Sequence, residues 1–396
     1  MAIEGAFWHP ARLRVVLACL AMANLAMSAA ILWALHGPGG SGTLMDFSAL
    51  WAAGRMAALG EASAAYDVAA ITAVQSEALG RAYEREMAWL YPPFLQLGLV
   101  PFGLMPMLAA QALWTVLTLA AYLTVCWRVL PDWGAVLAGL APATVVMLAV
   151  NGQTGFLLAA FAGLAMVGFV RGMRGQGGLH LGLLAMKPQV ALFLPLPFLM
   201  RGPWLALAVA AGTVTALVAL ATAVFGTGVW WGFLDGIGIG ARDLERPDIL
   251  SNQATVRAAL LIAGAGPDLA WVAQVSLALV ALTILIRWRG LPTEALAALA
   301  IYAGIAATPR VMDYDLTILV IGGLFQARRM MAAGGPGLEK AVMAVVLLLP
   351  LGDLLSGMPL NWMAAPVLML TLLFGERVRA RSVAAQSGRA TGPSAV

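Results

Sequence analysis

The segment from residue 15 to residue 35 reads VVLACLAMANLAMSAAILWAL, 21 residues without a charged side chain. About 20 apolar residues in a helix are long enough to cross the hydrocarbon core of a bilayer. Arg12 and Arg14 precede the segment, so a signal peptide is a second interpretation, with Ser28-Ala29-Ala30 as a passable cleavage sequence. Because the apolar run exceeds the ~7–15 residues of a signal core, we expect an uncleaved first membrane helix.

The remainder of the 396-residue chain has the same character, since 62% of its residues are hydrophobic and only 11% are charged. A soluble domain carries roughly 25% charged residues. Nine further apolar segments are candidate spans: 108–127, 134–150, 155–170, 203–225, 268–286, 292–307, 314–327, 339–355 and 361–375. The composition therefore predicts an all-α, polytopic membrane protein with about 10–12 transmembrane helices.

Two apolar stretches contain too many prolines for straight helices. Residues 92–106 include four of them, which predicts an interfacial or re-entrant piece. Residues 179–200 are interrupted by Lys187-Pro188 and by two later prolines, so we expect two short helices that meet near Lys187. Broken helices are tolerated at membrane depth only where they are buried in protein or line a cavity.

The distribution of basic residues predicts an orientation. With the N-terminus in the cytoplasm, 15 of the 23 basic residues fall on the cytoplasmic side, as the positive-inside rule requires. The large loops 36–107 and 226–257 then lie on the outer face, and the first of them contains short amphipathic helices over 50–59 and 64–79. We expect one membrane domain over 1–383 and a disordered cytoplasmic tail over 384–396.

Asp46 is the first acidic residue after Glu4, and it follows a loop of small residues at the outer end of the first span. An acidic side chain placed against membrane-embedded helices is costly and is by default a candidate for function. The alternative is that Asp46 only caps a short helix that begins at Phe47. The sequence alone leaves both interpretations open.

Several further groups of residues follow Asp46 in a characteristic order: Trp51 and Gly54, Tyr91-Pro92-Pro93, Trp114, Asn151-Gly152-Gln153, Gly182 with Lys187-Pro188, Trp204, and Asn252-Gln253. This order and spacing resembles glycosyltransferase family 87, a group of polytopic enzymes of the GT-C fold. The resemblance implies transfer of a hexose, mannose in characterised members, from a polyprenyl-phosphate carrier, with Asp46 as catalytic base. The chain departs from the family at 309–314, which reads PRVMDY where a histidine is common.

The same chemistry follows from the residue types. An acceptor hydroxyl that attacks an anomeric carbon loses its proton, which a carboxylate such as Asp46 can take. The departing phosphate needs cations or dipoles, for which we select Lys187, then Arg310 and Arg55. Each has a structural alternative: Lys187 can snorkel to an interface, Arg310 can pair with Asp313 or Asp315, and Arg55 can anchor at the membrane surface.

Five side chains are candidates for binding the sugar or the acceptor: Trp51, Asn151, Gln153, Asn252 and Gln253. The amides can equally form turns, and the tryptophan can belong to an aromatic belt.

The predicted partners are a polyprenyl-phosphate sugar as substrate, a glycolipid or glycan acceptor, and the lipid bilayer. We expect no cofactor, no protein-bound metal site and no nucleic acid. The predicted location is a bacterial inner membrane, with both termini in the cytoplasm and the active site on the periplasmic face. A transporter or lipid translocase, and a non-catalytic membrane scaffold, are the competing functions.

Overall fold

The computed structural model describes residues 10–38, 45–83, 87–202, 204–243, 246–346, 349–350 and 359–390. Within these ranges the chain is almost entirely helical, and the extended pairing consists of one isolated antiparallel bridge between Gln253 and Met312. The prediction of an all-α polytopic membrane protein is confirmed.

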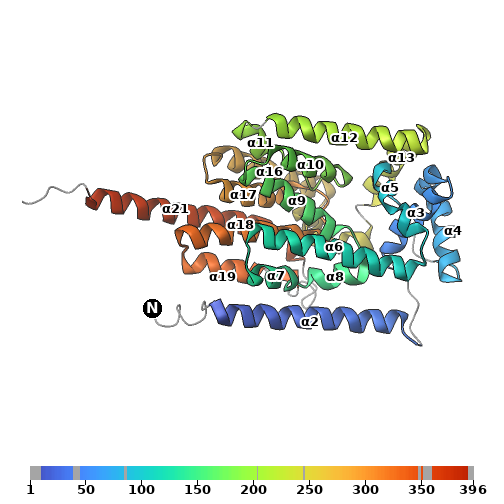
Figure 1. The fold of residues 1–396 in the computed structure, drawn as a ribbon, viewed down its shortest axis with the longest axis horizontal. Helices are drawn as coiled ribbons and strands as arrows, with labels where there is room; N and C mark the ends of the chain where they lie inside the picture. The colour runs from blue at the N-terminus through green and yellow to red at the C-terminus, as the bar shows by residue number, and fades with distance from the viewer. Residues whose placement is uncertain are drawn as a thin grey trace, which may run out of the picture.

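Helices visible in Figure 1 that run along the long axis of the molecule include α2 (Pro10–His36), α6 (Met107–Val129), α12 (Trp204–Phe225), α18 (Thr317–Ala333) and α21 (Ala364–Ala390). Further helices, of 15 to 21 residues, are α9 (Gly155–Val170), α16 (Pro267–Arg287) and α17 (Thr293–Ala307). The helices α3 (Phe47–Ala58), α4 (Val68–Leu79), α5 (Pro93–Gly103) and α13 (Gly228–Asp243) gather at one end, which we call the loop end.

Shorter elements complete the described chain. They are η1 (Ala62–Tyr66), α7 (Trp133–Leu140), α8 (Thr144–Asn151), α10 (Arg174–Leu183), η2 (Leu184–Met186), α11 (Leu196–Arg201), α14 (Pro247–Leu250), α15 (Val256–Ile262), η3 (Asp313–Leu316), α19 (Gly337–Val346) and η4 (Asn361–Met363).

Five helices in the described ranges are long and apolar enough to cross a membrane: residues Ala11–His36, Met107–Val129, Trp204–Phe225, Pro267–Arg287 and Asp313–Ala333. The pair α7–α8 makes a sixth if it counts as one span, and α9 and α17 are shorter apolar helices. In the part of the chain that the structure describes, five to six segments thus meet the test for a full span, where the sequence predicts about 10–12 transmembrane helices for the whole chain.

The predicted span over 134–150 corresponds to α7 and α8, which pass the length and composition test together but are bent by 68°. Pro142 lies at the bend, where its missing N–H and its ring interrupt a helix. The side-chain amide of Asn24 on α2 donates to the carbonyl oxygens at the bend, at 3.0 Å from Leu140 and 2.8 Å from Ala141. A neighbouring helix thus satisfies the backbone groups that the break exposes.

The predicted break near Lys187 is present. The helix α10 continues into η2, which ends at Met186, and the chain turns back before α11. The hairpin packs against α12 through glycine: a Cβ at Gly178 would lie 2.2 Å from the carbonyl oxygen of Ala206. At the turn, the Thr308 hydroxyl donates to the carbonyl of Gln189 at 2.7 Å. The hairpin therefore carries Lys187 toward the loop that follows α17.

The bounds of two segments differ from the predictions. The predicted disordered tail over 384–396 overlaps α21, which continues to Ala390 in a segment rich in helix-forming alanine. The expected helix over 64–79 is divided into η1 and α4, because Asp67 caps α4 by accepting from the backbone N–H of Ala70. Residues 391–396, and 347–348 and 351–358 within the predicted span 339–355, lie outside the described chain.

The packing has a large core and a smaller one. Every residue of α17 from Ala295 to Ala307 is buried, and α9 and α18 surround this helix. The smaller core, at the loop end, joins α3 to α5. These two helices approach closely because glycine replaces side chains: a Cβ at Gly54 would lie 2.3 Å from the carbonyl oxygen of Leu99. This packing fixes the position of α3, and with it that of Asp46.

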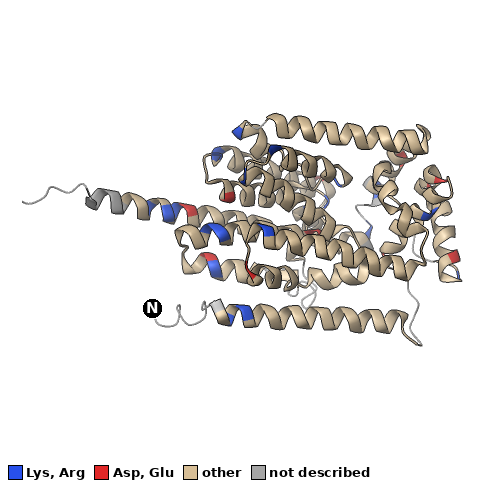
Figure 2. Cartoon of the chain, viewed as in Figure 1, with Lys and Arg blue, Asp and Glu red and all other residues tan. Residues whose placement is uncertain are grey.

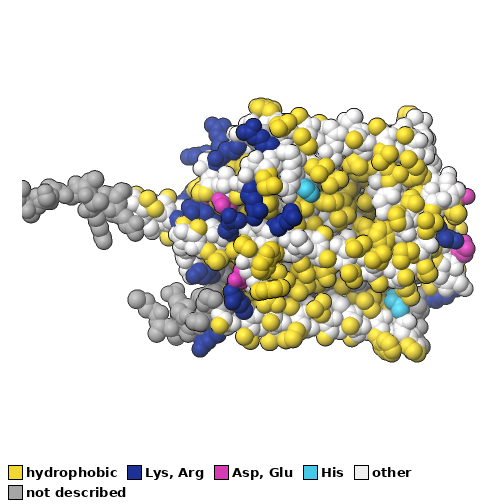
Figure 3. Space-filling model, viewed as in Figure 1, with side chains coloured by type: hydrophobic (Ala, Val, Ile, Leu, Met, Phe, Trp, Pro, Cys, Tyr) yellow, Lys and Arg dark blue, Asp and Glu magenta, His cyan; other side chains and the backbone are white. Residues whose placement is uncertain are grey.

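Lysine and arginine side chains gather at the end of the molecule where α2 begins and α21 ends, which we call the basic end (Figures 2 and 3). Between this end and the loop end, the visible surface is largely apolar (Figure 3). The two ends therefore differ in charge in the way that the positive-inside rule describes.

Candidate active site

Asp46 immediately precedes α3, but its side chain does not cap the helix. Its backbone is helical, with φ −55° and ψ −26°, and it makes no side-chain capping bond. A capping aspartate would adopt an extended backbone and accept from the N–H two or three residues on. Instead, the Asp46 Oδ2 atom accepts a hydrogen bond of 3.0 Å from the side-chain amide of Gln153. The partly exposed carboxylate therefore belongs to a tertiary contact.

Gln153 lies in the turn between α8 and α9, and this turn is built against the start of α3. Gly152 has φ +66°, a left-handed conformation in which side chains are strained. A Cβ at Gly152 would lie 2.7 Å from the Cβ atom of Phe47. The glycine therefore serves two purposes, because it turns the chain and it allows the turn to touch the residue after Asp46.

Tyr91 is a second contact of Gln153. Its hydroxyl donates to Gln153 Oε1 at 3.1 Å, and it forms a further bond of 3.1 Å with the hydroxyl of Thr154. Burial raises the pKa of the Tyr91 hydroxyl. The Lys187 ammonium and the bond to Thr154 oppose this rise, and the carboxylates of Asp315 and Asp46 add to it. The charges of Asp46, Lys187 and Asp315 thus act on one buried hydroxyl.

Lys187 is paired with Asp315. Its Nζ atom lies 2.7 Å from both carboxylate oxygens, and it lies 5.1 Å from the centroid of the Tyr314 ring. The Lys187 side chain is 8% exposed and that of Asp315 is fully buried. Asp315 Oδ2 also accepts from the backbone N–H of Met312 at 3.1 Å. We call Asp46, Tyr91, Gln153, Lys187 and Asp315 the polar site.

The loop between α17 and α18 forms one wall of the polar site. Residues 311–313 lie antiparallel to residues 252–254: the N–H of Ala254 donates to Val311 and that of Asp313 donates to Asn252, at 2.8 and 3.0 Å. Asn252 thus contributes a backbone carbonyl, and the Gln253 side chain is buried at the bridge.

The same loop orients two more charged side chains. Asp313 accepts from the amide of Asn361 at 2.9 Å. Arg310 donates to the carbonyl of Gly240 at 3.0 Å, and its charge acts on the Tyr314 hydroxyl together with that of Asp46. Among the described residues, the structure does not show the alternative ion pair of Arg310 with Asp313 or Asp315. The arginine extends to α13, and Asp315 is paired with Lys187.

Three of the predicted residues are arranged differently. Trp51 is buried, its indole N–H donates to the carbonyl of Met105 at 2.9 Å, and the Arg55 guanidinium lies 5.6 Å from its ring centroid. Eight residues of α3 separate Arg55 from Phe47, about 12 Å along the helix. The first contact joins α3 to the segment between α5 and α6, and the second lies within α3; neither is a contact with Asp46. Asn151 ends α8 in the turn that carries Gln153.

Three residues in or next to the polar site were not identified from the sequence: Tyr91, Thr154 and Asp315. Tyr91 was named only in the pattern that resembles the family, and neither Tyr91 nor Thr154 was selected as a site residue. Asp315 was considered as a possible partner of Arg310, not of Lys187. Nothing in the local sequence marks the Tyr91 hydroxyl as a contact of Gln153, because 61 residues separate the two. Among the residues that the structure describes, no group of three or more histidine, cysteine or acidic side chains has an arrangement suited to a metal ion.

Charged and amide side chains that contact one another within an all-helical chain define the class: a polytopic membrane protein with a polar site. The sequence model of glycosyltransferase family 87 matches residues 89–309. The match covers more than half of the chain, so the chain belongs to this family. It is therefore a glycosyltransferase. No curated protein and no solved structure gives a match.

Proposed function

We propose that this glycosyltransferase transfers a hexose, mannose by the family resemblance, from a polyprenyl-phosphate donor to a hydroxyl group of a glycolipid or glycan. The reaction is a single displacement with inversion at the anomeric carbon, and Asp46 is the base. The observation that supports it best is the partly exposed Asp46 carboxylate, which accepts from Gln153. Gln153 in turn contacts Tyr91, on whose hydroxyl the charges of Asp46 and Lys187 both act.

The proposed step accounts for each proton and electron pair. The acceptor oxygen attacks the anomeric carbon, and its proton passes to a carboxylate oxygen of Asp46. As the new carbon–oxygen bond forms, the bond from the anomeric carbon to the phosphate oxygen breaks, and its electron pair leaves with polyprenyl phosphate. The leaving phosphate gains one negative charge, so its departure is favoured by cations that are already in place.

Lys187 and Arg310 are the proposed donors to that phosphate. An ammonium has three N–H donors, and two of those of Lys187 are directed to Asp315. The third is available to an additional acceptor. Arg310 has five N–H groups, of which one donates to Gly240. Gln153, with Asn151, Asn252 and Gln253 near the same loops, supplies the proposed contacts to sugar hydroxyls.

The proposed orientation places the loop end, and with it Asp46, in the periplasm of a bacterial inner membrane, and both termini in the cytoplasm. The concentration of lysine and arginine at the basic end supports it (Figure 3). Residues 1–383 are proposed to act as one membrane domain. Family membership favours this account over a transporter, a lipid translocase or a non-catalytic scaffold.

The test is a transfer assay with the purified protein in liposomes, using a panel of polyprenyl-phosphate hexoses and acceptor glycans. We expect transfer from one such donor, with a product whose anomeric configuration, measured by NMR, is opposite to that of the donor. Retention of configuration would contradict the single displacement. Transfer from nucleotide sugars alone would contradict the lipid-linked donor.

A further inference from the structure

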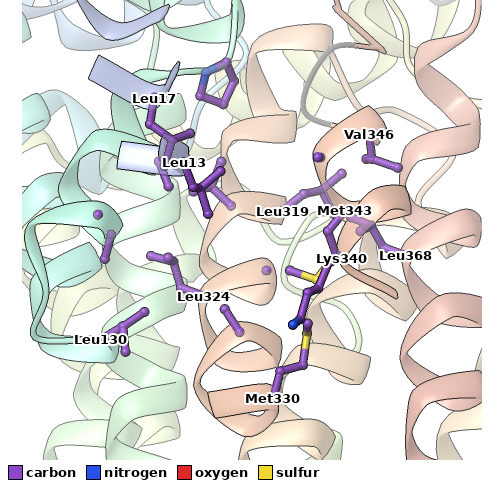
Figure 4. A pocket seen from close by; sticks show the side chains of 18 of the residues that line it. Leu13, Leu17, Leu130, Leu319, Leu324, Met330, Lys340, Met343, Val346 and Leu368 are labelled. Atoms are coloured by element: carbon purple, nitrogen blue, oxygen red, sulfur yellow. The ribbon is translucent and has the colours of Figure 1, made fainter. Parts of the chain in front are cut away.

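A cavity of about 440 Å³ lies between α2, α7, α18, α19 and α21 (Figure 4). Side chains from several helices surround it, among them Leu17, Leu324 and Met343. Its lining is almost entirely apolar. An apolar cavity of this size between helices is of the size that ligands occupy in proteins, and none of the chemistry of the polar site accounts for it.

The cavity follows α18 over most of its length. It is lined by Leu316 at one end of this stretch and by Met331 at the other. Fifteen residues of helix separate them, about 22 Å at 1.5 Å per residue. This is about three quarters of the ~30 Å hydrocarbon core of a bilayer. The cavity is therefore long and narrow and runs along a membrane-spanning helix, a shape that suits an extended hydrocarbon chain.

One end of the cavity adjoins the polar site. Leu316 follows Asp315 directly in the chain, and Asp315 is the partner of Lys187. Thr144, also in the lining, is hydrogen-bonded to the hydroxyl of Thr317 at 3.2 Å. The apolar cavity thus begins one residue along the chain from the carboxylate that binds Lys187.

The other end reaches the basic end of the molecule. Arg14, Asp132 and Lys340 line it there, and Arg14 and Asp132 form an ion pair with each other. Charged side chains of this kind mark the membrane surface. The cavity therefore ends where the hydrocarbon core of the bilayer ends.

We infer that this cavity holds the hydrocarbon chain of the donor lipid, so that the prenyl chain runs from the polar site along α18 toward the basic end. This inference rests on the proposed function for the identity of the lipid. It adds a binding site for the chain that contains none of the residues proposed to act in the reaction. The proposed occupant is the prenyl chain. The alternative occupant, which the experiment below distinguishes, is a membrane phospholipid whose headgroup contacts Lys340.

The chain offers a matched pair of glycines for the test. A Cβ at Gly323, in the cavity, meets only the terminal methyl of Met343 at 3.7 Å, so a larger side chain there extends into the cavity. A Cβ at Gly212, on α12, meets nothing within 4 Å. The variants Gly323→Leu and Gly212→Leu thus make the same change in two membrane helices. Ala327→Phe, with Ala211→Phe as its control, is the second pair if Gly323→Leu does not fold.

The first measurement is photolabelling of the full chain in phospholipid nanodiscs. The probe is a long-chain prenyl monophosphate with a diazirine at the far end of the chain, and the adducts are mapped by peptide mass spectrometry. We expect adducts on α18 and α19 near Met330 and Met343. Labelling should fall about tenfold in Gly323→Leu, because the added side chain would displace roughly two methylene groups of the prenyl chain from the cavity. Labelling should stay unchanged in Gly212→Leu.

Two results would overturn the inference. One is labelling confined to lipid-facing helices such as α6 and α12. The other is labelling of the cavity by a diazirine phospholipid that excess prenyl phosphate does not displace and that Lys340→Gln abolishes, since this would identify the rival occupant. Lys340→Gln should leave labelling by the prenyl probe unchanged.

The second measurement is the dependence of KM on the length of the donor chain. In wild-type protein and Gly212→Leu, a long-chain donor should have the lower KM, and in Gly323→Leu this preference should fall about tenfold with the short-chain rate unchanged. If Gly323→Leu keeps the wild-type preference for the long-chain donor, the inference is contradicted. If the probe labels α18 but no prenyl-phosphate sugar supports transfer, the proposed function fails and the cavity assignment stands.

Discussion

Two carboxylates, Asp46 at the loop end and Glu339 on α19, are held in different ways. Glu339 is fully buried, forms an ion pair of 2.9 Å with Arg379, and accepts from Gln326 at 2.9 Å. Asp46 is partly exposed and accepts from the neutral amide of Gln153. A buried ion pair fixes the arrangement of helices, whereas a carboxylate that is oriented by an amide and reached by solvent can exchange a proton with a substrate.

The Lys187–Asp315 pair shares properties with both carboxylates. It is as buried as the pair of Glu339, yet its charges act on the Tyr91 hydroxyl together with the charge of Asp46. The comparison therefore predicts that changes at Glu339 affect stability, changes at Asp46 affect chemistry, and changes at Lys187 affect both. The predictions that follow test this division.

Lys187→Ala is expected to have the largest effect. It leaves the Asp315 carboxylate buried without its cation, which costs about 3–5 kcal/mol of stability. Thermal unfolding of the purified protein measures this loss. The double variant Lys187→Met with Asp315→Leu removes both charges and should regain most of the stability.

The double variant also separates the two roles of Lys187. If the lysine contacts the donor phosphate, the double variant is stable and still inactive in sugar transfer. Transfer at the wild-type rate in the double variant would show that the pair is only structural.

Glu339→Gln comes next. The neutral side chain keeps the shape of the glutamate but loses the charge that Arg379 faces, so we expect a loss of about 2 kcal/mol in stability. Arg379 keeps its contact with Glu376 at 2.9 Å, which limits the loss. Transfer activity per folded molecule should stay within about twofold of wild type, because a change of up to 0.4 kcal/mol in the barrier has this effect. A stable but inactive Glu339→Gln would contradict the claim that Glu339 contributes to stability alone.

Gly152→Ala should damage the polar site with a smaller cost in stability, of about 1–2 kcal/mol. The added methyl is strained at φ +66° and would meet Phe47, so it pushes the turn that carries Gln153 away from Asp46. Gly172→Ala is the control, since Gly172 has φ +69° and a Cβ there meets nothing within 4 Å. Both variants should lose similar stability, and only Gly152→Ala should lose most of its transfer activity. Equal activities would show that the contact with Phe47 is unimportant.

Tyr91→Phe is expected to have the smallest effect. It removes a hydroxyl that donates to Gln153 and pairs with Thr154, at a cost of about 1 kcal/mol of stability. Because Gln153 loses one of its contacts, we also expect a loss of transfer rate of up to about fivefold, which corresponds to about 1 kcal/mol in the barrier. Because burial raises the pKa of this hydroxyl, the folded protein holds the proton more tightly than the unfolded chain. Wild-type stability should therefore fall as the pH rises above about 10, and Tyr91→Phe should reduce that fall. A variant with the same alkaline stability profile as wild type would contradict the burial argument.

The sequence predicted those features that depend on local composition. Apolar runs gave the membrane helices, and the Lys187-Pro188 pair gave the break between α10 and α11, because proline removes a helical hydrogen bond wherever it occurs. The bend at Pro142 follows the same rule and was missed because the surrounding run is continuously apolar. The helical tail to Ala390 was missed because its composition of alanine and serine is compatible with both helix and coil.

The polar site was predictable only in part. Asp46, Gln153 and Lys187 stand out because polar residues are rare in this chain and lie near glycine or proline. Their contacts do not stand out: Lys187 and Asp315 are 128 residues apart, and Gln153 and Asp46 are 107 apart. Trp51 shows the converse, since it looks suited to a sugar but is buried against Met105 by the packing of α3 on α5. Such pairings are decided by tertiary packing.

The central claim is that Asp46 takes the proton of the acceptor. The measurement that tests it most directly is the single-turnover rate of sugar transfer by Asp46→Asn with the donor already bound. The amide keeps the size of the carboxylate and loses the basic oxygen, so we predict a rate at least about a hundredfold lower, with donor binding and thermal unfolding unchanged. Transfer by Asp46→Asn at the wild-type rate would contradict the account.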